Sequence, residues 1–172
     1  MTADPPPAAA AIADLGHPGA LELLTHQALA RMAYAGTDGF PRVIPVGFWW
    51  NGAQVIVCTA PTSPKFRALA IRPHVALTID SDDASTTLSV RGVATMEVVD
   101  GVPDEYLAAT SKSMSREQAR QFEAQVRSVY KEMARISIEP AWVRYYDFPG
   151  GRIPEFLRQL TERSDNGNGP GS

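Results

Sequence analysis

Apolar and polar positions alternate along most of the chain between residues 28 and 148, which is the period of half-buried β-strands. Asp38-Gly39 and Asn51-Gly52 interrupt the pattern, and both pairs are strong signals of hairpin turns. The expected strands are 28–36, 41–50, 54–59, 74–80, 86–100 and 134–148. Gly92 lies inside a long strand and predicts a bulge. Consecutive hairpins give an antiparallel sheet, so the pattern predicts a mainly β fold, a six-stranded antiparallel β-barrel with peripheral helices.

Other segments have helical spacing or a helix-start signal instead of alternation. They are residues 18–26, 63–72, 103–131 and 153–160. Ser63 is expected to cap the second of these helices, with Pro64 as its first residue. The third is expected in two pieces, because Ser115 and Gln118 resemble a capping box.

The two ends of the chain differ in composition from the middle. Residues 1–17 are rich in Pro and Ala and residues 163–172 in Gly and Asn, so we expect a disordered leader and a disordered tail. The 172 residues then leave a single domain over 18–162.

Composition excludes several classes of function. The net charge of −3 argues against a nucleic-acid partner, because phosphate backbones require clustered positive charge. Cys58 is the only cysteine, which rules out an intrachain disulfide and cysteine-based zinc sites, and no histidine spacing predicts a metal site. No apolar run approaches the ~20 residues of a membrane span, so we expect no membrane partner and a cytoplasmic protein. The many Ala and Arg residues are typical of a GC-rich bacterial source.

Residues 59–65 carry the most informative chemistry. They join a strand end to a helix start, where free N–H groups and the helix dipole favour a phosphate. Thr59, Thr62 and Ser63 supply hydroxyls, and Lys65 adds a positive charge in the first turn, where the dipole disfavours a cation. On spacing alone, an ordinary N-cap followed by a solvated lysine is the simpler interpretation.

The sequence around this segment resembles the flavin-binding split-barrel family, the pyridoxamine 5'-phosphate oxidase-like group. The resemblance rests on TDGFPRVIPVGFWWNG (37–52), QVIVCT (54–59) and SPKFRALAIRPHVALTI (63–79), in that order. SVRGVATME (89–97) is similar to the family's strand with a central glycine. The resemblance covers residues 20–100 well and the C-terminal part loosely, and it implies an FMN-binding split barrel.

The resemblance also implies roles for single residues. Lys65 matches the lysine that holds the flavin phosphate, Ser63 a phosphate-binding position, and Thr59 a hydroxyl at the strand end. Arg42 matches an arginine that approaches the ribityl phosphate in some members. Thr62 lies between these positions and is assigned to the same site.

Further positions are implied along the flavin ring. The ring edge is expected to follow Val43, Ile44, Pro45 and Val46. Thr87 corresponds to a polar position that reaches the cofactor across a dimer interface. The family's sites lie between two barrels, so the resemblance implies a homodimer with the cofactor at the subunit interface.

The implied activity is that of an FMN-dependent oxidoreductase acting on a small organic substrate. The flavin carries the chemistry, so no catalytic side chain is expected. The family's Ser-Arg-Lys phosphate motif reads Ser63-Pro64-Lys65 here, and the C-terminal substrate signature is absent. Oxidation of pyridoxamine phosphate itself is therefore not expected.

Two alternatives remain open. A 5-deazaflavin coenzyme would need more basic residues along the groove for its anionic tail, and Arg42, Arg67 and Arg152 are available. A non-catalytic flavin- or haem-binding protein is the other; haem would need an axial histidine, and only His74 lies in the barrel region.

Overall fold

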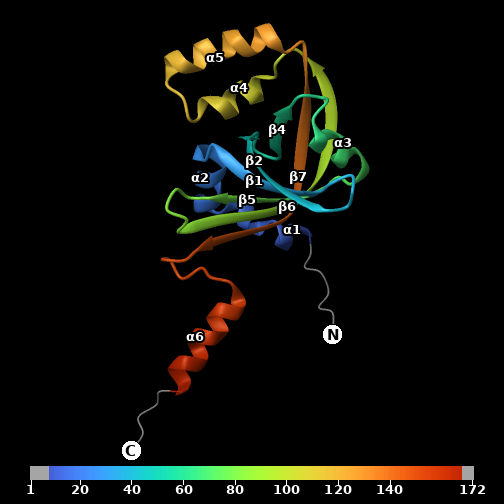
Figure 1. Cartoon of the computed structure of the whole chain (residues 1–172). Coiled ribbons are helices and arrows are strands. Elements are labelled where there is room, and N and C mark those ends of the chain that lie inside the picture. Colours follow the sequence, from blue (N-terminus) through green and yellow to red (C-terminus); the bar gives the residue numbers. More distant parts are fainter. Residues whose placement is uncertain (1–7, 168–172) are drawn as a thin grey trace, which may run out of the picture.

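The structure, a computed structural model, describes residues 8–167 and contains one antiparallel sheet. Its strands are β1 Leu29–Ala35, β2 Pro41–Gly47, β3 Trp49–Trp50, β4 Val55–Thr59, β5 His74–Asp80, β6 Thr86–Asp100 and β7 Glu132–Asp147. They pair in the order β2-β1-β5-β6-β7-β4-β3, and every pairing is antiparallel (Figure 1). The mainly β prediction is confirmed.

The sheet has seven strands where six were expected, because the predicted strand 41–50 breaks at Phe48. β2 pairs with β1 at one edge of the sheet, whereas β3 pairs with β4 at the other. The Phe48 side chain is fully buried at the break. The chain therefore passes from one sheet edge to the other at this residue, and a seam is left between β2 and β4.

Helices surround the sheet. They are α1 Ala8–Ala11, the 3₁₀ turn η1 Ala13–Gly16, α2 Pro18–His26, α3 Pro64–Ile71, α4 Asp104–Ser111, α5 Arg116–Val129 and α6 Glu155–Gly167. The helix expected over 18–26 has those bounds, and the Ser115 capping box forms. α4 and α5 lie together at one end of the barrel, and α6 projects beyond the other end (Figure 1).

The disorder expected over residues 1–17 does not extend to the described part of the leader. α1 and η1 are helical and pack against β7. The reason is a partly buried anchor: the Asp14 carboxylate accepts the Tyr145 N–H at 2.9 Å, and Arg144 donates to the Ala11 carbonyl at 3.4 Å. Residues 1–7 lie outside the described residues.

The C-terminal tail and the second hairpin also differ from expectation. α6 continues to Gly167, so residues 163–167 are helical, and 168–172 lie outside the described residues. Trp50 pairs with Val55, so residues 51–54 connect β3 and β4, instead of the two-residue turn expected at Asn51-Gly52. The Asn51 side chain instead accepts the Ala53 and Gln54 N–H groups at 2.9 and 2.7 Å.

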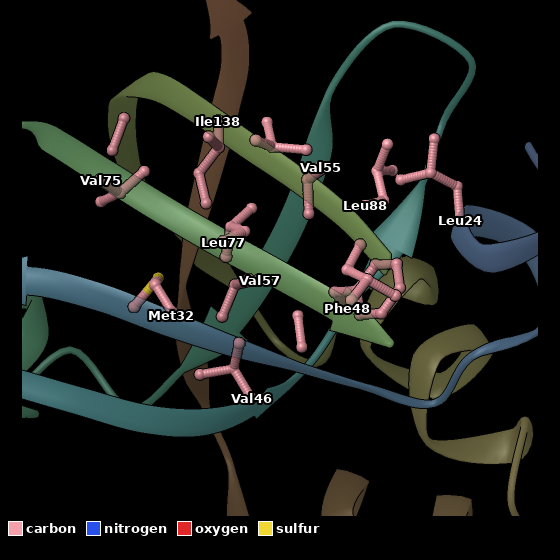
Figure 2. Packing of buried hydrophobic residues seen from close by; sticks show 14 of the residues in the cluster. Leu24, Met32, Val46, Phe48, Val55, Val57, Val75, Leu77, Leu88 and Ile138 are labelled. Atoms are coloured by element: carbon pink, nitrogen blue, oxygen red, sulfur yellow. The ribbon is translucent and has the colours of Figure 1, made fainter. Parts of the chain in front are cut away.

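The core fills the inside of the curved sheet. Inward-facing residues of the strands pack against α2 and against each other, with Leu24, Phe48 and Leu88 at one end (Figure 2). Val46 of β2 and Val57 of β4 belong to the same cluster, so side chains close the barrel where no backbone hydrogen bonds do.

Gly92 forms the predicted bulge. The β6–β7 register shifts between Arg91 and Gly92, which face Trp142 and Pro140. A Cβ at Gly92 would lie 2.4 Å from the Glu139 carbonyl oxygen and 2.9 Å from a methyl of Ile138. The close crossing of the two longest strands therefore requires glycine.

We expect Gly92→Ala to lower the free energy of unfolding by about 1–3 kcal/mol, because backbone must move to admit the methyl group. Urea unfolding measures this change. Gly16→Ala is the control, since a Cβ there meets nothing within 4 Å, and it should change stability by less than about 1 kcal/mol. Equal stability of the two variants would contradict a close packing role for Gly92.

Candidate functional site

The segment between β4 and α3 has the geometry that its sequence predicts. β4 ends at Thr59, and the Ser63 N–H donates to the Ala60 carbonyl at 3.0 Å, which closes a turn. Ser63 is the N-cap of α3 and accepts the Phe66 N–H at 3.4 Å, with Pro64 as the first helical residue. The helix start is thus fixed in place beside the strand end.

Lys65 lies in the first turn of α3 and is half-buried. Burial lowers the pKa of its ammonium group, since desolvation disfavours the charged form. Within residues 8–167, no carboxylate forms an ion pair with Lys65, and no acceptor bonds its side chain. A partly desolvated cation at the positive end of a helix fits an anionic group such as a phosphate, which would supply the missing counter-charge.

Arg42 lies on β2, opposite Tyr34 of β1. Its guanidinium donates to the Asp38 carboxylate at 2.7 Å, in an exposed ion pair. The Phe40 N–H, and secondarily Arg42, hold the pKa of Asp38 below its ordinary value. Arg42 therefore already has a carboxylate partner, and a role toward a phosphate stays a prediction.

β2 is an edge strand, so one side of its backbone has no strand partner. Val43 and Pro45 are exposed, Ile44 is half-buried, and Val46 packs in the core. Val43 and Pro45 thus face solvent, whereas Ile44 and Val46 face the barrel. The predicted contact of these four residues with a flavin ring stays a prediction.

Thr87 does not join this group within one chain. It pairs with Asp80 at the far end of β5, whereas α3 leads into the opposite end of that strand at His74. Seven residues of strand separate the two ends by about 20 Å. The Thr87 hydroxyl donates to Asp80 at 2.9 Å, and Asp80 also accepts Arg31 at 2.8 Å.

A cavity of about 350 Å³ lies between α4 and the outer face of β4. It is lined by Ala28, Leu29, Gly47, Ile56, Cys58, Glu105, Tyr106, Ala109, Thr110, Ser113 and Met114. α4 packs against β2, β3 and β4, so it crosses the seam where the two sheet edges meet. No pattern in the sequence predicts this cavity, because its walls combine residues 28–58 with a helix that follows β6.

The polar groups of the cavity differ in charge state. Glu105 accepts two hydrogen bonds from Arg135, at 2.9 and 3.0 Å, which compensates its charge. Burial, with Glu105 as the second cause, raises the pKa of the Cys58 thiol to about 12. Burial also raises the pKa of the Tyr106 hydroxyl. The thiol and the phenol are therefore neutral at physiological pH.

Lys112 is a functional candidate that the sequence did not reveal. Its ammonium donates to the Leu24 and Gln27 carbonyls at 3.2 and 3.0 Å, and lies 4.2 Å from the Phe48 ring centroid. Burial lowers its pKa to about 8. It caps the C-terminus of α2 across 85 or more residues of sequence, and no local pattern signals such a contact.

The remaining candidates have structural partners. Arg152 forms an ion pair with Asp14 and donates to the Tyr145 carbonyl at 2.9 Å, so it holds η1 against β7. The guanidinium carbons of Arg91 and Arg144 lie 4.2 and 5.1 Å from the ring centroid of Trp142.

The described residues contain no group of three His, Cys, Asp or Glu side chains that could hold a metal ion. None of the described helices has both the length and the apolar character of a membrane span.

Comparison with known proteins places these features in a family. The family model described as pyridoxamine 5'-phosphate oxidase matches residues 18–147, which include the whole sheet and α2 to α5. No curated protein matches the sequence significantly.

Solved structures share the fold at low identity. A protein described as an F420 reductase has a TM-score of 0.55 and 21% identity over 72% of this chain and 94% of its own. An FMN-binding, pyridoxamine 5'-phosphate oxidase-related protein from Nostoc punctiforme has a TM-score of 0.56 and 12% identity over 80% of this chain and 86% of its own. A haem storage protein from Vibrio cholerae has a TM-score of 0.54 and 16% identity over 76% of this chain and 93% of its own.

We expect Cys58 in the native protein to react with a disulfide reagent such as DTNB at least about tenfold more slowly at pH 8 than an ordinary thiol. A pKa near 12 rather than 9.0 leaves about a thousandth of the thiolate, and the higher nucleophilicity of the remaining thiolate offsets only part of that loss. Absorbance of the released thiolate measures the rate, and the same protein in guanidinium should react promptly. A native rate equal to the denatured rate would show that the thiol is not desolvated.

Proposed function

The chain belongs to the pyridoxamine 5'-phosphate oxidase family, and from this premise we propose that it is an FMN-dependent oxidoreductase acting on a small organic molecule. The observation that carries the proposal is Lys65, a half-buried cation without an anionic partner among the described residues, at the start of α3. The flavin, when bound, supplies the redox chemistry.

The chain's own residues would then bind and orient the cofactor. Lys65 would bond the phosphate, with the hydroxyls of Thr59, Thr62 and Ser63 around it. The Ser63 hydroxyl already accepts the Phe66 N–H, and it can still donate its proton to a phosphate oxygen. The free backbone edge of β2 at residues 43–46 would lie along the ring.

A homodimer is part of the proposal. Thr87 lies at the far end of β5 from α3, so it reaches a cofactor held by Lys65 only from a second copy. Large apolar side chains are exposed around β2 and α3: Phe40, Val43 and Ile71 are 72%, 66% and 63% exposed. A dimer interface at this surface would bury these three apolar side chains.

The deazaflavin alternative keeps the fold and changes the coenzyme. The resemblance to an F420 reductase favours it. Of the three arginines suggested for the anionic tail, Arg152 is bound to Asp14 and Arg42 to Asp38, whereas Arg67 is exposed. Of these three arginines, only Arg67 has no ion pair in the described part of the chain, so FMN is the better supported cofactor.

The non-catalytic haem alternative has less support still, although one structural neighbour is a haem storage protein. His74 is exposed at the start of β5. His17 caps α2 and stacks on Tyr145 with ring centroids 4.5 Å apart. Neither histidine lines the cavity beneath α4.

We expect Lys65→Ala to weaken FMN binding roughly 10- to 100-fold, equivalent to about 1.5–3 kcal/mol, because a charge-assisted phosphate bond is lost. Fluorescence quenching of FMN gives the dissociation constant. Lys131→Ala removes the same charge from an exposed lysine and should leave the constant within twofold. Equal affinities for FMN in the Lys65 and Lys131 variants would remove Lys65 from the phosphate site.

We also expect sedimentation of a particle of about twice the 18.6 kDa chain mass in the presence of FMN. Thr87→Ala should weaken FMN binding without changing this mass, since it removes one hydroxyl contributed across the interface. A monomeric native protein that binds FMN, with an affinity that Thr87→Ala does not change, would contradict an FMN site shared between two copies.

A further inference from the structure

We propose that the cavity beneath α4 is the substrate compartment, and that it takes an uncharged, mainly apolar ring compound with an amide-type donor and acceptor. This inference rests on the proposed function, because it assigns the substrate to a place beside the flavin. It concerns residues that lie outside the predicted cofactor site.

The position of the cavity follows from the seam. β2 carries the four residues expected along the flavin ring, and Gly47, the next residue, lines the cavity. β4 contributes Ile56 and Cys58 before it ends at Thr59, where the phosphate segment begins. The cavity therefore lies where the ring end of a cofactor anchored at Lys65 would arrive, under the helix that crosses the seam.

The size of the cavity limits the ligand. A volume of about 350 Å³ is at the small end of the range for small-molecule sites. Leu29 and Ser113 are exposed, so the cavity opens to solvent at these residues. Apolar side chains, among them Ile56, Ala109 and Met114, supply much of the wall. A compound of one or two fused rings fits these limits.

The charge of the wall decides the ligand class. Among the described residues that line the cavity there is no lysine, arginine or histidine, and Glu105 is an anion. A carboxylate or phosphate group would lose its hydration without gaining a cationic partner, which is costly. An anionic substrate such as pyridoxamine phosphate is therefore disfavoured on physical grounds, independently of the missing family signature.

Two side-chain oxygen atoms of the wall make no hydrogen bond in the described part of the chain and can recognise an uncharged ligand, whereas the hydroxyls of Thr110 and Ser113 already donate to backbone carbonyls. Arg135 bonds only one oxygen of Glu105, and the other has no partner in the described part of the chain. The Tyr106 hydroxyl likewise has no bond there and stays protonated, because burial raises its pKa. One acceptor and one donor on adjacent residues of α4 match the N–H and C=O of an amide.

The test uses 2-naphthamide and 2-naphthoate, which have the same ring system and nearly the same size but differ in charge. Their binding to the full-length protein is measured by calorimetry, without and with saturating FMN. We expect 2-naphthamide to bind at least tenfold tighter than 2-naphthoate, and FMN to leave that binding unchanged or to strengthen it. No binding of either compound, or tighter binding of the naphthoate, would overturn the assignment.

Matched variants locate the bound probe. Ser113→Trp places a large ring at the rim of the cavity and should weaken 2-naphthamide binding at least tenfold. Ser111→Trp is the control, because Ser111 is exposed on α4 and does not line this cavity. Glu105→Gln removes the anion of the wall, so it should reduce the ratio of the 2-naphthoate to the 2-naphthamide dissociation constant. Equal binding by the two tryptophan variants would place the probe elsewhere and overturn the proposal.

The same titrations separate this proposal from the proposed function. Competition between FMN and 2-naphthamide would mean that the cavity holds the flavin ring itself, which overturns the substrate compartment and keeps the flavin site. Binding of 2-naphthamide by a protein that binds no flavin would overturn the oxidoreductase, and with it the role of the cavity as a compartment for a flavin substrate.

Discussion

The burial of Phe48 is the constraint on which the architecture of the site depends. At this residue the chain leaves the β1 edge of the sheet and joins the β4 edge, so the barrel closes through side chains and a seam remains. Lys112 from the end of α4 lies over the Phe48 ring and bonds the last carbonyls of α2. Lys112 thereby connects α4, which crosses the seam, to Phe48, the residue at which the seam forms.

The candidate site is organised along this seam. Lys65 marks one part of it, as a partly desolvated cation without a counter-charge in the described chain. The free edge of β2 follows, and the cavity under α4 comes next, with an anion and no cation in its described wall. This separation of charge suits a cofactor with a phosphate at one end and a substrate without one at the other. It is consistent with a family in which the cofactor, and not the protein, supplies the redox group.

Local signals in the sequence were sufficient for much of the fold. The bounds of β5, β6 and α2, the Ser63 cap and the Gly92 bulge all follow from residues near one another in the chain. The break at Phe48 did not follow, because alternation continues through it and only the pairing partners change. The same limit applies to Lys112, the cavity and the packed leader, each of which depends on contacts between residues distant in sequence.

The most direct test of the account compares FMN with riboflavin, which lacks the phosphate, in the native protein and in Lys65→Ala. If Lys65 supplies the counter-charge of the phosphate, the native protein should prefer FMN by roughly tenfold or more, and the variant should lose most of that preference while its affinity for riboflavin stays the same. An undiminished preference for FMN in the variant would contradict a phosphate site at the start of α3.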